Sequence, residues 1–571
     1  MRAARRFFAP GVVVLLAIMA TLEVSTSLEE NQSFDEHVHL ASGYAYWKAG
    51  AYWCNPEHPA LIKLLAAVPL LFQNLTLVTE SPAWKVRSAP DVGVEFLYYN
   101  SLPADRILES ARVPLMLLAL AFGAAMAWWV RRRFGQTAAL AALAFYCLDP
   151  NLIAHSRYVT DDVALAGFFF LASVAWSEYL ATSKERYLVA ASLLCALAAV
   201  TKYSGLVLLP IFAVLYAIRW WQTPRGFSLR RAVADAASIG AAILVTILVV
   251  YWPDTLRCLR GGPGALASHA YLAGIGMVAR MNSVGHDNYL LGRLSTHGWW
   301  YYFPVAFAVK STVASLAAVA VMLTAVVGWW RHSGAPGRWQ RLREAPFLWY
   351  GLSVPPMLFF GACVASTINI GIRYILPVYL FLYVAASVAL VNLPWRFARV
   401  LLAALLVIQA AECLSIYPHY LAFFNVLAGG PANGPRYLVD SNIDWGQDVK
   451  KLARWLKSRG TDRVYLRYFG SDRMWNEGLK TATVPGTEER AARENVDGFV
   501  AVSVTNLMGV DIRGTYLSID TPVEVRVSQL MGDQPPEHEY AWLRQMTPVA
   551  KVGYSIYVYD LRKPRSAAPG R

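Results

Sequence analysis

The sequence predicts a polytopic α-helical membrane protein with a small α/β domain at its C-terminal end. The chain has 571 residues, of which 56% are hydrophobic and only 16% charged, a composition too apolar for a soluble protein. Apolar runs of about 20 residues, the length that crosses a bilayer, recur from the N-terminus to about residue 416 and then stop. We therefore divide the chain into a transmembrane domain at residues 1–416 and an α/β domain at residues 417–571.

The hydropathy pattern predicts about 11 transmembrane helices. The first run follows Arg2, Arg5 and Arg6, and its length favours a retained helix over a cleaved signal peptide. The expected spans are 7–27, 113–130, 137–155, 163–181, 187–201, 203–220, 233–251, 301–330, 346–365, 374–393 and 398–416.

The basic residues between the spans predict the orientation, because loops rich in Lys and Arg stay in the cytoplasm. When the spans are threaded in order, every basic cluster falls on the side of the N-terminus. The clusters are Arg131–Arg133, Lys184 with Arg186, Arg219–Arg231, Arg331–Arg343, and Arg396 with Arg399. The opposite side, which we expect to be extracytoplasmic, then holds a long first loop at 28–112, several shorter loops and the C-terminal domain. Since the net charge of +14 arises from these clusters, we expect no nucleic-acid partner.

The C-terminal domain has the alternating pattern of short strands and one amphipathic helix. The helix is expected over Asp444–Arg459, and Gly460 ends it. The expected strands are Tyr437–Val439, Val464–Phe469, Phe499–Val504 and Ser555–Tyr559.

The six cysteines form no zinc-binding spacing. Four of them lie in apolar runs, and only Cys54 and Cys258 lie in loops where a disulfide could form.

The first loop opens with the carboxylates Asp35 and Glu36, directly after the first span. Asp and Glu favour the first turn of a helix, so a solvated helix start is the simplest interpretation of this pair taken alone. The context favours a functional site, because Asn55-Pro56-Glu57-His58-Pro59 then leads into an apolar stretch that carries Lys63. That stretch, Ala60–Leu71, is too short to span and is expected to lie in the membrane interface.

Three further polar features lie at the ends of later spans. They are Asp149-Pro150 with His155, Arg157 and Thr160-Asp161-Asp162; Thr201-Lys202-Tyr203 in a tight hairpin; and Gly371-Ile372-Arg373-Tyr374. A boundary charge or a lysine that extends toward water explains each one singly. Two carboxylates that lead directly into an apolar span are harder to explain in this way. All the features fall on one membrane face, which favours a common site.

The order of these motifs resembles the GT-C superfamily of membrane glycosyltransferases. The motifs are Asp35-Glu36, Glu57-His58-Pro59, Thr160-Asp161, Thr201-Lys202 and Arg373-Tyr374-Ile375-Leu376-Pro377. Within the superfamily, the chain resembles the bacterial relatives of protein O-mannosyltransferases and of the lipid A aminoarabinose transferase. Tyr417–Asn425 and Val439–Asp448 further resemble a bacterial branch of family 39-like glycosyltransferases.

The resemblance implies a multi-pass protein of the bacterial inner membrane with an extracytoplasmic active site. It implies catalytic carboxylates at Asp35, with Glu36 beside it, and at Asp161. It places the donor phosphate at Lys202 and, less securely, at His58, where the aminoarabinose enzyme has a lysine. The other candidates for substrate binding are Lys63, His155, Arg157, Asp162, Arg373 and Tyr374.

The chemistry implied by the resemblance suits these residue types. A polyprenyl-phosphate sugar has a good leaving group, so one base that takes the proton of the acceptor hydroxyl is enough, and direct displacement inverts the stereochemistry. Fixed cations such as Lys202 and Arg373 would stabilise the phosphate as it leaves. The expected partners are membrane lipid, this lipid-phosphate donor and an extracytoplasmic acceptor, which is a protein, a lipid or a glycan. No obligatory cofactor or metal is expected.

Two other classes of protein fit part of the pattern. A transporter of a lipid-linked or polar substrate also places polar residues at membrane depth, but such sites lie near the midplane and often accompany inverted repeats, which this sequence lacks. A metal-dependent enzyme could use Asp35, Glu36, His37, His39 and His58 as zinc or manganese ligands.

Overall fold

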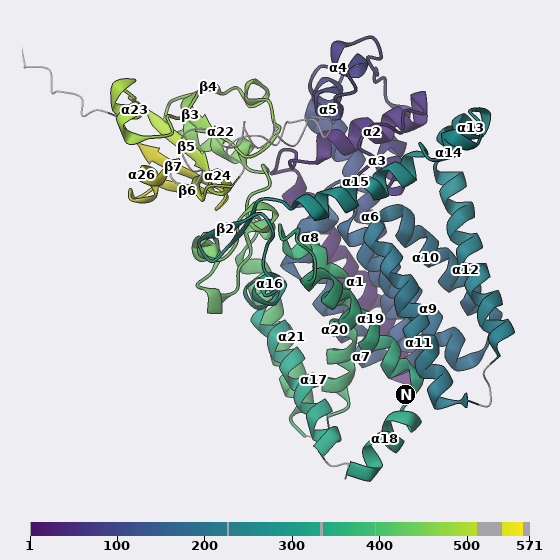
Figure 1. Ribbon diagram of the computed structural model, residues 1–571. Coiled ribbons are helices and arrows are strands. Elements are labelled where there is room, and N and C mark those ends of the chain that lie inside the picture. The colour runs from purple at the N-terminus through teal and green to yellow at the C-terminus, as the bar shows by residue number, and fades with distance from the viewer. Residues whose placement is uncertain (1, 225–227, 332–334, 394–395, 511–538, 563–571) are drawn as a thin grey trace, which may run out of the picture.

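The computed structural model is a long helical bundle with a separate sheet domain at one end (Figure 1). It describes residues 2–224, 228–331, 335–393, 396–510 and 539–562. Within these ranges, nine helices are long and apolar enough to cross a membrane. They are α1 (Arg2–Ser27), α6 (Ala104–Phe134), α9 (Asp162–Thr182), α11 (Leu208–Gln222), α12 (Leu229–Val250), α17 (Val313–Arg331), α19 (Phe347–Val364), α20 (Leu376–Val391) and α21 (Ala398–Ser415); the 3-10 turns η2 (Tyr203–Val207) and η4 (Ile372–Ile375) extend α11 and α20.

The structure differs from the predicted spans in three places. The span expected at 137–155 is a broken pair, α7 (Gln136–Cys147) and α8 (Pro150–Ser156), bent by 64°. Asp149 causes the break by capping α8, where its Oδ1 accepts the Leu152 N–H at 2.8 Å. The span expected at 187–201 is α10 (Glu185–Thr201), whose 17 residues are somewhat short for crossing a bilayer alone.

The third difference is that the span expected at 301–330 is two helices, α16 (Tyr302–Lys310) and α17. The chain breaks at Ser311 and Thr312, because the Thr312 hydroxyl accepts the Ser315 N–H at 3.1 Å and Glu412 accepts the Val313 N–H at 3.1 Å. These bonds satisfy donors that would otherwise be unpaired at the start of α17. Hydropathy cannot detect such a break, since the residues on both sides are apolar.

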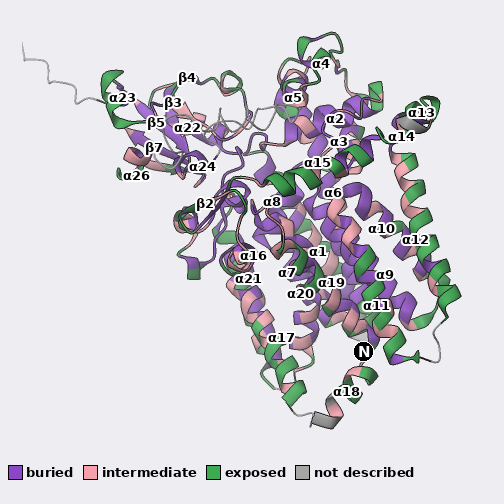
Figure 2. Cartoon of the chain, in the orientation of Figure 1, coloured by how far each residue is buried: buried purple, intermediate pink, exposed green. Residues whose placement is uncertain are grey.

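Buried residues fill the centre of the bundle and exposed residues lie along its outer helices (Figure 2), where many of the exposed side chains are large and apolar. In α9, 94% of the most apolar stretch is buried, whereas in α12 the share is 11%. The outer face of α12 exposes Leu244, Val245 and Val249. An exposed apolar surface of this kind needs lipid around it, so the chain is a multi-pass membrane protein.

The basic clusters lie together at one end of the bundle, with the N-terminus and α18 (Ala335–Glu344) (Figure 1). Three contacts establish this arrangement. The Arg131 guanidinium is 4.3 Å from the Phe8 ring, Arg231 pairs with Glu185 at 3.0 Å, and Arg219 lies 5.7 Å from the Phe347 ring.

The opposite end carries the long loops. The first loop folds into the helices α2 (Glu36–Ala49), α3 (Leu61–Ala67), α4 (Pro82–Lys85) and α5 (Ala89–Tyr98). Its apolar stretch forms α3 and the 3-10 turn η1 (Val68–Phe72), which pack on α2 and α6. The other elements at this end are α13 (Trp252–Arg260), α14 (Pro263–Leu266), α15 (Ala270–Val284) and the antiparallel hairpin of β1 (Asn288–Leu290) and β2 (Arg293–Ser295). Cys54 and Cys258 are both free thiols.

The C-terminal part is a mixed five-stranded sheet of β3 (Arg463–Arg467), β4 (Lys480–Ala482), β5 (Phe499–Ser503), β6 (Ala550–Val552) and β7 (Ile556–Asp560). The strand order is β4-β3-β5-β7-β6. Strand β3 is parallel to β4 and β5, and β7 is antiparallel to β5 and β6. Three of the predicted strands are confirmed in β3, β5 and β7. The predicted helix is confirmed in α22 (Val449–Ser458), although it begins five residues later than expected. The remaining elements are η9 (Met474–Glu477), α23 (Glu488–Arg493), α24 (Val504–Leu507) and α26 (Ala541–Arg544).

The strand predicted at Tyr437–Val439 is wrong. Residues between α21 and α22 form four 3-10 turns, and Asp440 takes a left-handed backbone with φ of 59°. Apolar residues of this stretch, such as Tyr420 and Trp445, share the core of the membrane helices. The turns are η5 (Tyr420–Ala422), η6 (Val426–Ala428), η7 (Pro431–Arg436) and η8 (Asp440–Asn442).

Candidate active site

Asp35 is the carboxylate of the site that is most open to solvent. It precedes α2 in the N-cap position, but its side chain makes no capping bond. About a quarter of the side chain is exposed (27%), and its Oδ2 lies 3.8 Å from Nη1 of Arg373. The carboxylate therefore forms an ion pair on one side and is accessible to solvent on the other.

Glu36, the other predicted catalytic carboxylate of the first loop, points away from Asp35 into the protein. Its two oxygens accept from Arg112 at 2.9 and 2.7 Å, from the Val159 N–H at 2.9 Å and from the Ser33 N–H at 2.7 Å. Both side chains of the Glu36–Arg112 pair are fully buried. A carboxylate with all its acceptor positions occupied is not free to take a proton, so we assign Glu36 a positioning role that ties α2 to α6.

Asp161 and Asp162 lie where the short loop after α8 enters α9, and both contact Lys202. Lys202 follows α10 in an extended backbone conformation, and its Nζ is 2.9 Å from Asp161 Oδ1 and also pairs with Asp162. Nδ1 of His58 lies 3.0 Å from Asp161 Oδ2. Burial alone would raise the pKa of Asp161, but Lys202 and His58 outweigh it and hold that pKa well below its usual range.

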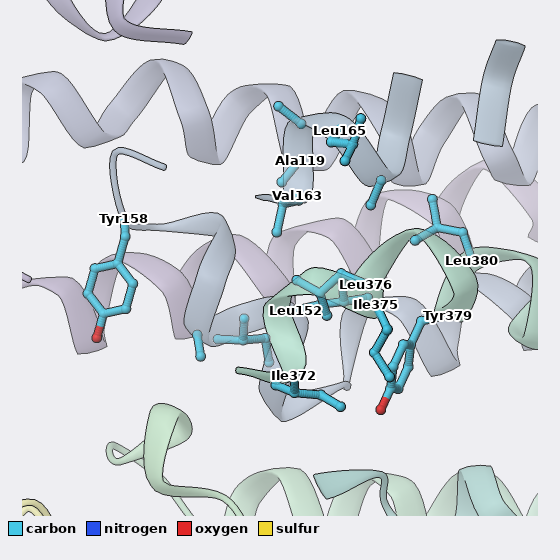
Figure 3. Close-up of a cluster of buried hydrophobic side chains, with 14 of the residues drawn as sticks. Ala119, Leu152, Tyr158, Val163, Leu165, Ile372, Ile375, Leu376, Tyr379 and Leu380 are labelled. Carbon is cyan, nitrogen blue, oxygen red and sulfur yellow. The ribbon is translucent and has the colours of Figure 1, made fainter. Parts of the chain in front are cut away.

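Arg373 and Tyr374 complete the cluster from η4. Nη1 of Arg373 lies 3.5 Å from Asp162 Oδ2, so Asp162 bridges the two cations. The Tyr374 ring lies 4.8 Å from Lys202 Nζ and 5.3 Å from the Arg373 guanidinium carbon, within the range of cation–π contacts. The neighbours Ile372 and Ile375 belong to the apolar core, where they lie near Leu152 and Leu376 (Figure 3).

The cluster thus joins five segments that are far apart in the sequence. Its charged members are the carboxylates Asp35, Asp161 and Asp162 and the basic side chains Lys202 and Arg373. Each carboxylate pairs with at least one of the two cations. Both cations are already engaged by carboxylates in this arrangement. The Nε of Arg373 is buried without a hydrogen-bond partner among the described residues, so this guanidinium retains a donor for an anionic ligand.

Three of the predicted substrate-binding residues have partners inside the protein. Lys63 is 1% exposed, and its Nζ donates to Asn55 Oδ1 at 3.0 Å and to the His58 carbonyl at 2.7 Å. Lys63 therefore shapes the loop that carries His58. Arg157 is fully buried and pairs with Glu30. His155 is also buried, with its ring 5.8 Å from the ring of Trp445.

Trp445 contacts the cluster, and Asp440 precedes it in the same loop; the sequence analysis assigned neither residue a role. The Trp445 ring lies 4.3 Å from the Arg373 guanidinium carbon. Burial raises the pKa of Asp440 to about 6, while Arg373 acts against this shift. The only sequence signal was the motif Val439–Asp448, whose resemblance to a glycosyltransferase branch carried no assigned chemistry.

The histidines of the first loop do not converge on a metal-binding geometry. Among the residues that the structure describes, no group of three or more His, Cys, Asp or Glu side chains is placed to hold a metal ion. His39 Nδ1 donates to the Val159 carbonyl at 2.6 Å, and its ring packs edge-on against His58. Burial lowers the pKa of both His37 and His39 to about 4.

Comparison with known families bears on the part of the chain that carries the Asp161 and Lys202 contacts. Residues 105–252 match the family described as dolichyl-phosphate-mannose-protein mannosyltransferase. This stretch contains Asp161, Asp162 and Lys202. Over this stretch, the match supports the predicted resemblance to membrane glycosyltransferases, and glycosyl transfer as the general activity.

Two solved structures are similar to the chain. ArnT from Cupriavidus metallidurans bound to undecaprenyl phosphate aligns with a TM-score of 0.48 and 14% identity, over 97% of this chain and 99% of that one. An oligosaccharyltransferase from Archaeoglobus fulgidus in complex with Zn and sulfate aligns with a TM-score of 0.38 and 13% identity, over 87% of this chain and 69% of that one. A search of curated proteins gave no significant match.

Proposed function

We propose that this chain is an inverting glycosyltransferase that moves a sugar from a polyprenyl-phosphate donor to an extracytoplasmic acceptor. The observation that carries the proposal is the pairing of Asp35, an accessible carboxylate, with Arg373, a buried cation 3.8 Å away. A single displacement requires a base for the acceptor hydroxyl on one side of the anomeric carbon and a cation for the departing phosphate on the other, and this pair supplies both kinds of group. The mannosyltransferase match supports a lipid-linked donor.

The proposed reaction is one displacement at the anomeric carbon. The acceptor hydroxyl attacks this carbon while Asp35 takes its proton, and the bond between the carbon and the phosphate oxygen breaks with its electrons on the phosphate. The leaving phosphate monoester gains a negative charge, which Arg373 and Lys202 stabilise. The products are the inverted glycoside and a free polyprenyl phosphate.

The geometry also suggests how the donor prepares the base. The contact between Arg373 and Asp35 is, at 3.8 Å, the longest of the ion pairs in the cluster, whereas Lys202 and Asp161 are 2.9 Å apart. A donor phosphate that binds Arg373 would displace Asp35 first. Asp35 would then be released from Arg373 and free to face the acceptor hydroxyl when the donor is in place.

The test is a reconstitution of purified protein with a polyprenyl-phosphate sugar and membrane extract as the source of acceptor. The proposal requires that wild-type protein release polyprenyl phosphate and transfer the sugar, with inversion at the anomeric carbon. A comparison of envelope glycans and glycolipids by mass spectrometry, with and without the gene, then identifies the acceptor. Movement of intact donor across the bilayer without bond cleavage would instead establish a transporter.

We expect the reaction to need no divalent metal, because Lys202 and Arg373 supply the cations for the departing phosphate. Turnover should therefore be unchanged, within about 2-fold, when EDTA is added to the reconstituted protein. Loss of turnover with EDTA and its recovery with manganese or magnesium would contradict this expectation, and would move the phosphate-binding role from Lys202 to a metal held near Asp35.

The proposed site requires that the first loop and the sheet domain lie outside the cytoplasm of a bacterial inner membrane. Thr79 and Thr483 are exposed at that end, and Lys184 is exposed at the other. In a background without the native cysteines, Thr79→Cys and Thr483→Cys should react with an impermeant maleimide in intact spheroplasts. Lys184→Cys should react only after lysis. Labelling of Lys184→Cys in intact spheroplasts would reverse the orientation.

A further inference from the structure

Residues 439–448, which we call the Trp445 segment, connect the membrane helices to α22 and lie directly against the loop that carries Arg373. The Ser441 hydroxyl donates to the Ile370 carbonyl at 2.7 Å, and the Ile372 N–H donates to Asn442 Oδ1 at 2.9 Å. Asn442 is itself held, because its carbonyl accepts from Lys310 Nζ at 2.6 Å. These bonds fix the backbone on the N-terminal side of Arg373.

The same segment also fixes the backbone next to Asp35. The Phe34 N–H donates to the Trp445 carbonyl at 2.8 Å, and the Asn31 side chain donates to the Gly446 carbonyl at 2.6 Å. Phe34 is held from the sheet domain as well, where its ring stacks on Phe469 at 5.1 Å. The position of Asp35 therefore depends on the C-terminal part of the chain.

The indole of Trp445 is the element of the segment that contacts the charged cluster. It is only 2% exposed, and its ring lies 4.3 Å from the Arg373 guanidinium carbon. His155 and Tyr158 pack against the indole edge-on, with centroids at 5.8 and 5.7 Å, and keep it from rotating. A fixed aromatic ring limits the directions in which a guanidinium can point.

We propose that Trp445 is a positioning residue for glycosyl transfer, which orients the Arg373 guanidinium through its indole and the Asp35 segment through its carbonyl. This inference rests on the proposed function. The inference gives the C-terminal part of the chain a direct role in building the site. Trp445 itself contacts neither the reacting carbon nor the side chain of the base. A side-chain substitution at Trp445 removes the indole contact and leaves the carbonyl contact in place, so the effect on Arg373 can be measured separately.

The experiment is a double-mutant cycle between Trp445 and Arg373, measured on full-length protein. The variants are Trp445→Leu, Trp445→Phe, Arg373→Ala and the double variant Trp445→Leu/Arg373→Ala. The matched control is Trp455→Leu, because Trp455 lies in α22 and packs on Phe499 at 5.1 Å, away from the cluster. Two quantities are measured for each protein: the dissociation constant for undecaprenyl phosphate, used as the probe, and kcat/KM for the donor. Melting temperatures identify variants that do not fold.

We expect Trp445→Leu to lower donor kcat/KM by about 10-fold and to weaken probe binding, whereas Trp445→Phe, which keeps an aromatic face, stays within about 3-fold of wild type. In the Arg373→Ala background, Trp445→Leu should cause almost no further loss, since the group that it orients is absent. Trp455→Leu should leave both quantities unchanged.

Two results would overturn the inference. One is a multiplicative loss in the double variant, which is the behaviour of a residue that only fills the core. The other is a Trp445→Phe variant that folds and is as impaired as Trp445→Leu. If wild type neither binds the probe nor turns over the donor, the proposed function fails and the inference fails with it. If Arg373→Ala weakens probe binding but Trp445→Leu leaves it unchanged, only the inference fails.

Discussion

Replacement of Asp35 by Asn should lower turnover by about 100-fold or more while the protein still folds, because it removes the proposed base and keeps the size of the side chain. The side chain is 27% exposed and makes one long ion pair, so its loss leaves no fully buried charge without a partner. The measurement is the initial rate of sugar transfer by purified protein, with the melting temperature as a test of folding. Donor KM should change less than kcat, since Asp35 acts on the acceptor.

The matched control for this substitution is Asp91→Asn. Asp91 is an exposed carboxylate of the same loop, and it accepts a hydrogen bond from its neighbour Ser88 at 2.6 Å. This variant should keep wild-type activity. A folded Asp35→Asn protein with substantial activity would contradict the mechanism, because Glu36, whose oxygens are occupied by Arg112, is not placed to replace it.

Replacement of Lys202 by Met should reduce kcat/KM for the donor by about 100-fold, since a cation directed at the departing phosphate is lost from a buried site. The structure adds a second consequence. Asp161 and Asp162 both contact Lys202, so the substitution leaves two buried carboxylates without this cation and should lower the melting temperature. Initial rates across a range of donor concentrations and thermal unfolding measure the two effects.

The two effects of Lys202→Met can be separated with further variants. Lys202→Arg retains the charge and should recover most of the stability and part of the donor use. Lys202→Met/Asp162→Asn removes one of the unpaired carboxylates and should recover stability without recovering donor use. Lys85→Met, at an exposed lysine that pairs with Glu80 at 3.4 Å, is the surface control. Full donor use in a folded Lys202→Met protein would remove this lysine from the site.

Much of the architecture could be predicted because its signals are local. The spans follow from runs of apolar residues, and the common end of the basic clusters follows from the order of spans. The strands β3, β5 and β7 follow from short runs of apolar, β-branched and aromatic residues. The errors occurred where a local signal was overridden. The break between α16 and α17 depends on Glu412, about 100 residues away, and no pattern within 301–330 contains it.

The sequence predicted where the candidate site lies, but decided neither which of the candidate residues form the cluster nor how they pair. Residue types and order placed Asp35, Asp161, Asp162, Lys202 and Arg373 at one membrane face, and the structure brings these five side chains together. Sequence reasoning could not separate them from Glu36, Lys63 and Arg157, which have the same chemical types in the same loops. The difference lies in their partners, since Arg112, the loop carbonyls and Glu30 satisfy these three groups inside the fold.

By itself, therefore, the sequence determined that the chain spans a membrane many times, that its basic loops share one end and that its polar motifs gather at the other. Only the tertiary structure decided which charges pair with one another, that Asp162 bridges Lys202 and Arg373, and that Trp445 lies against the guanidinium. The physical reason is range. Hydrophobic transfer and backbone preference act on neighbouring residues and leave a periodic pattern, whereas the role of a charged side chain depends on the solvent and partner that folding assigns to it.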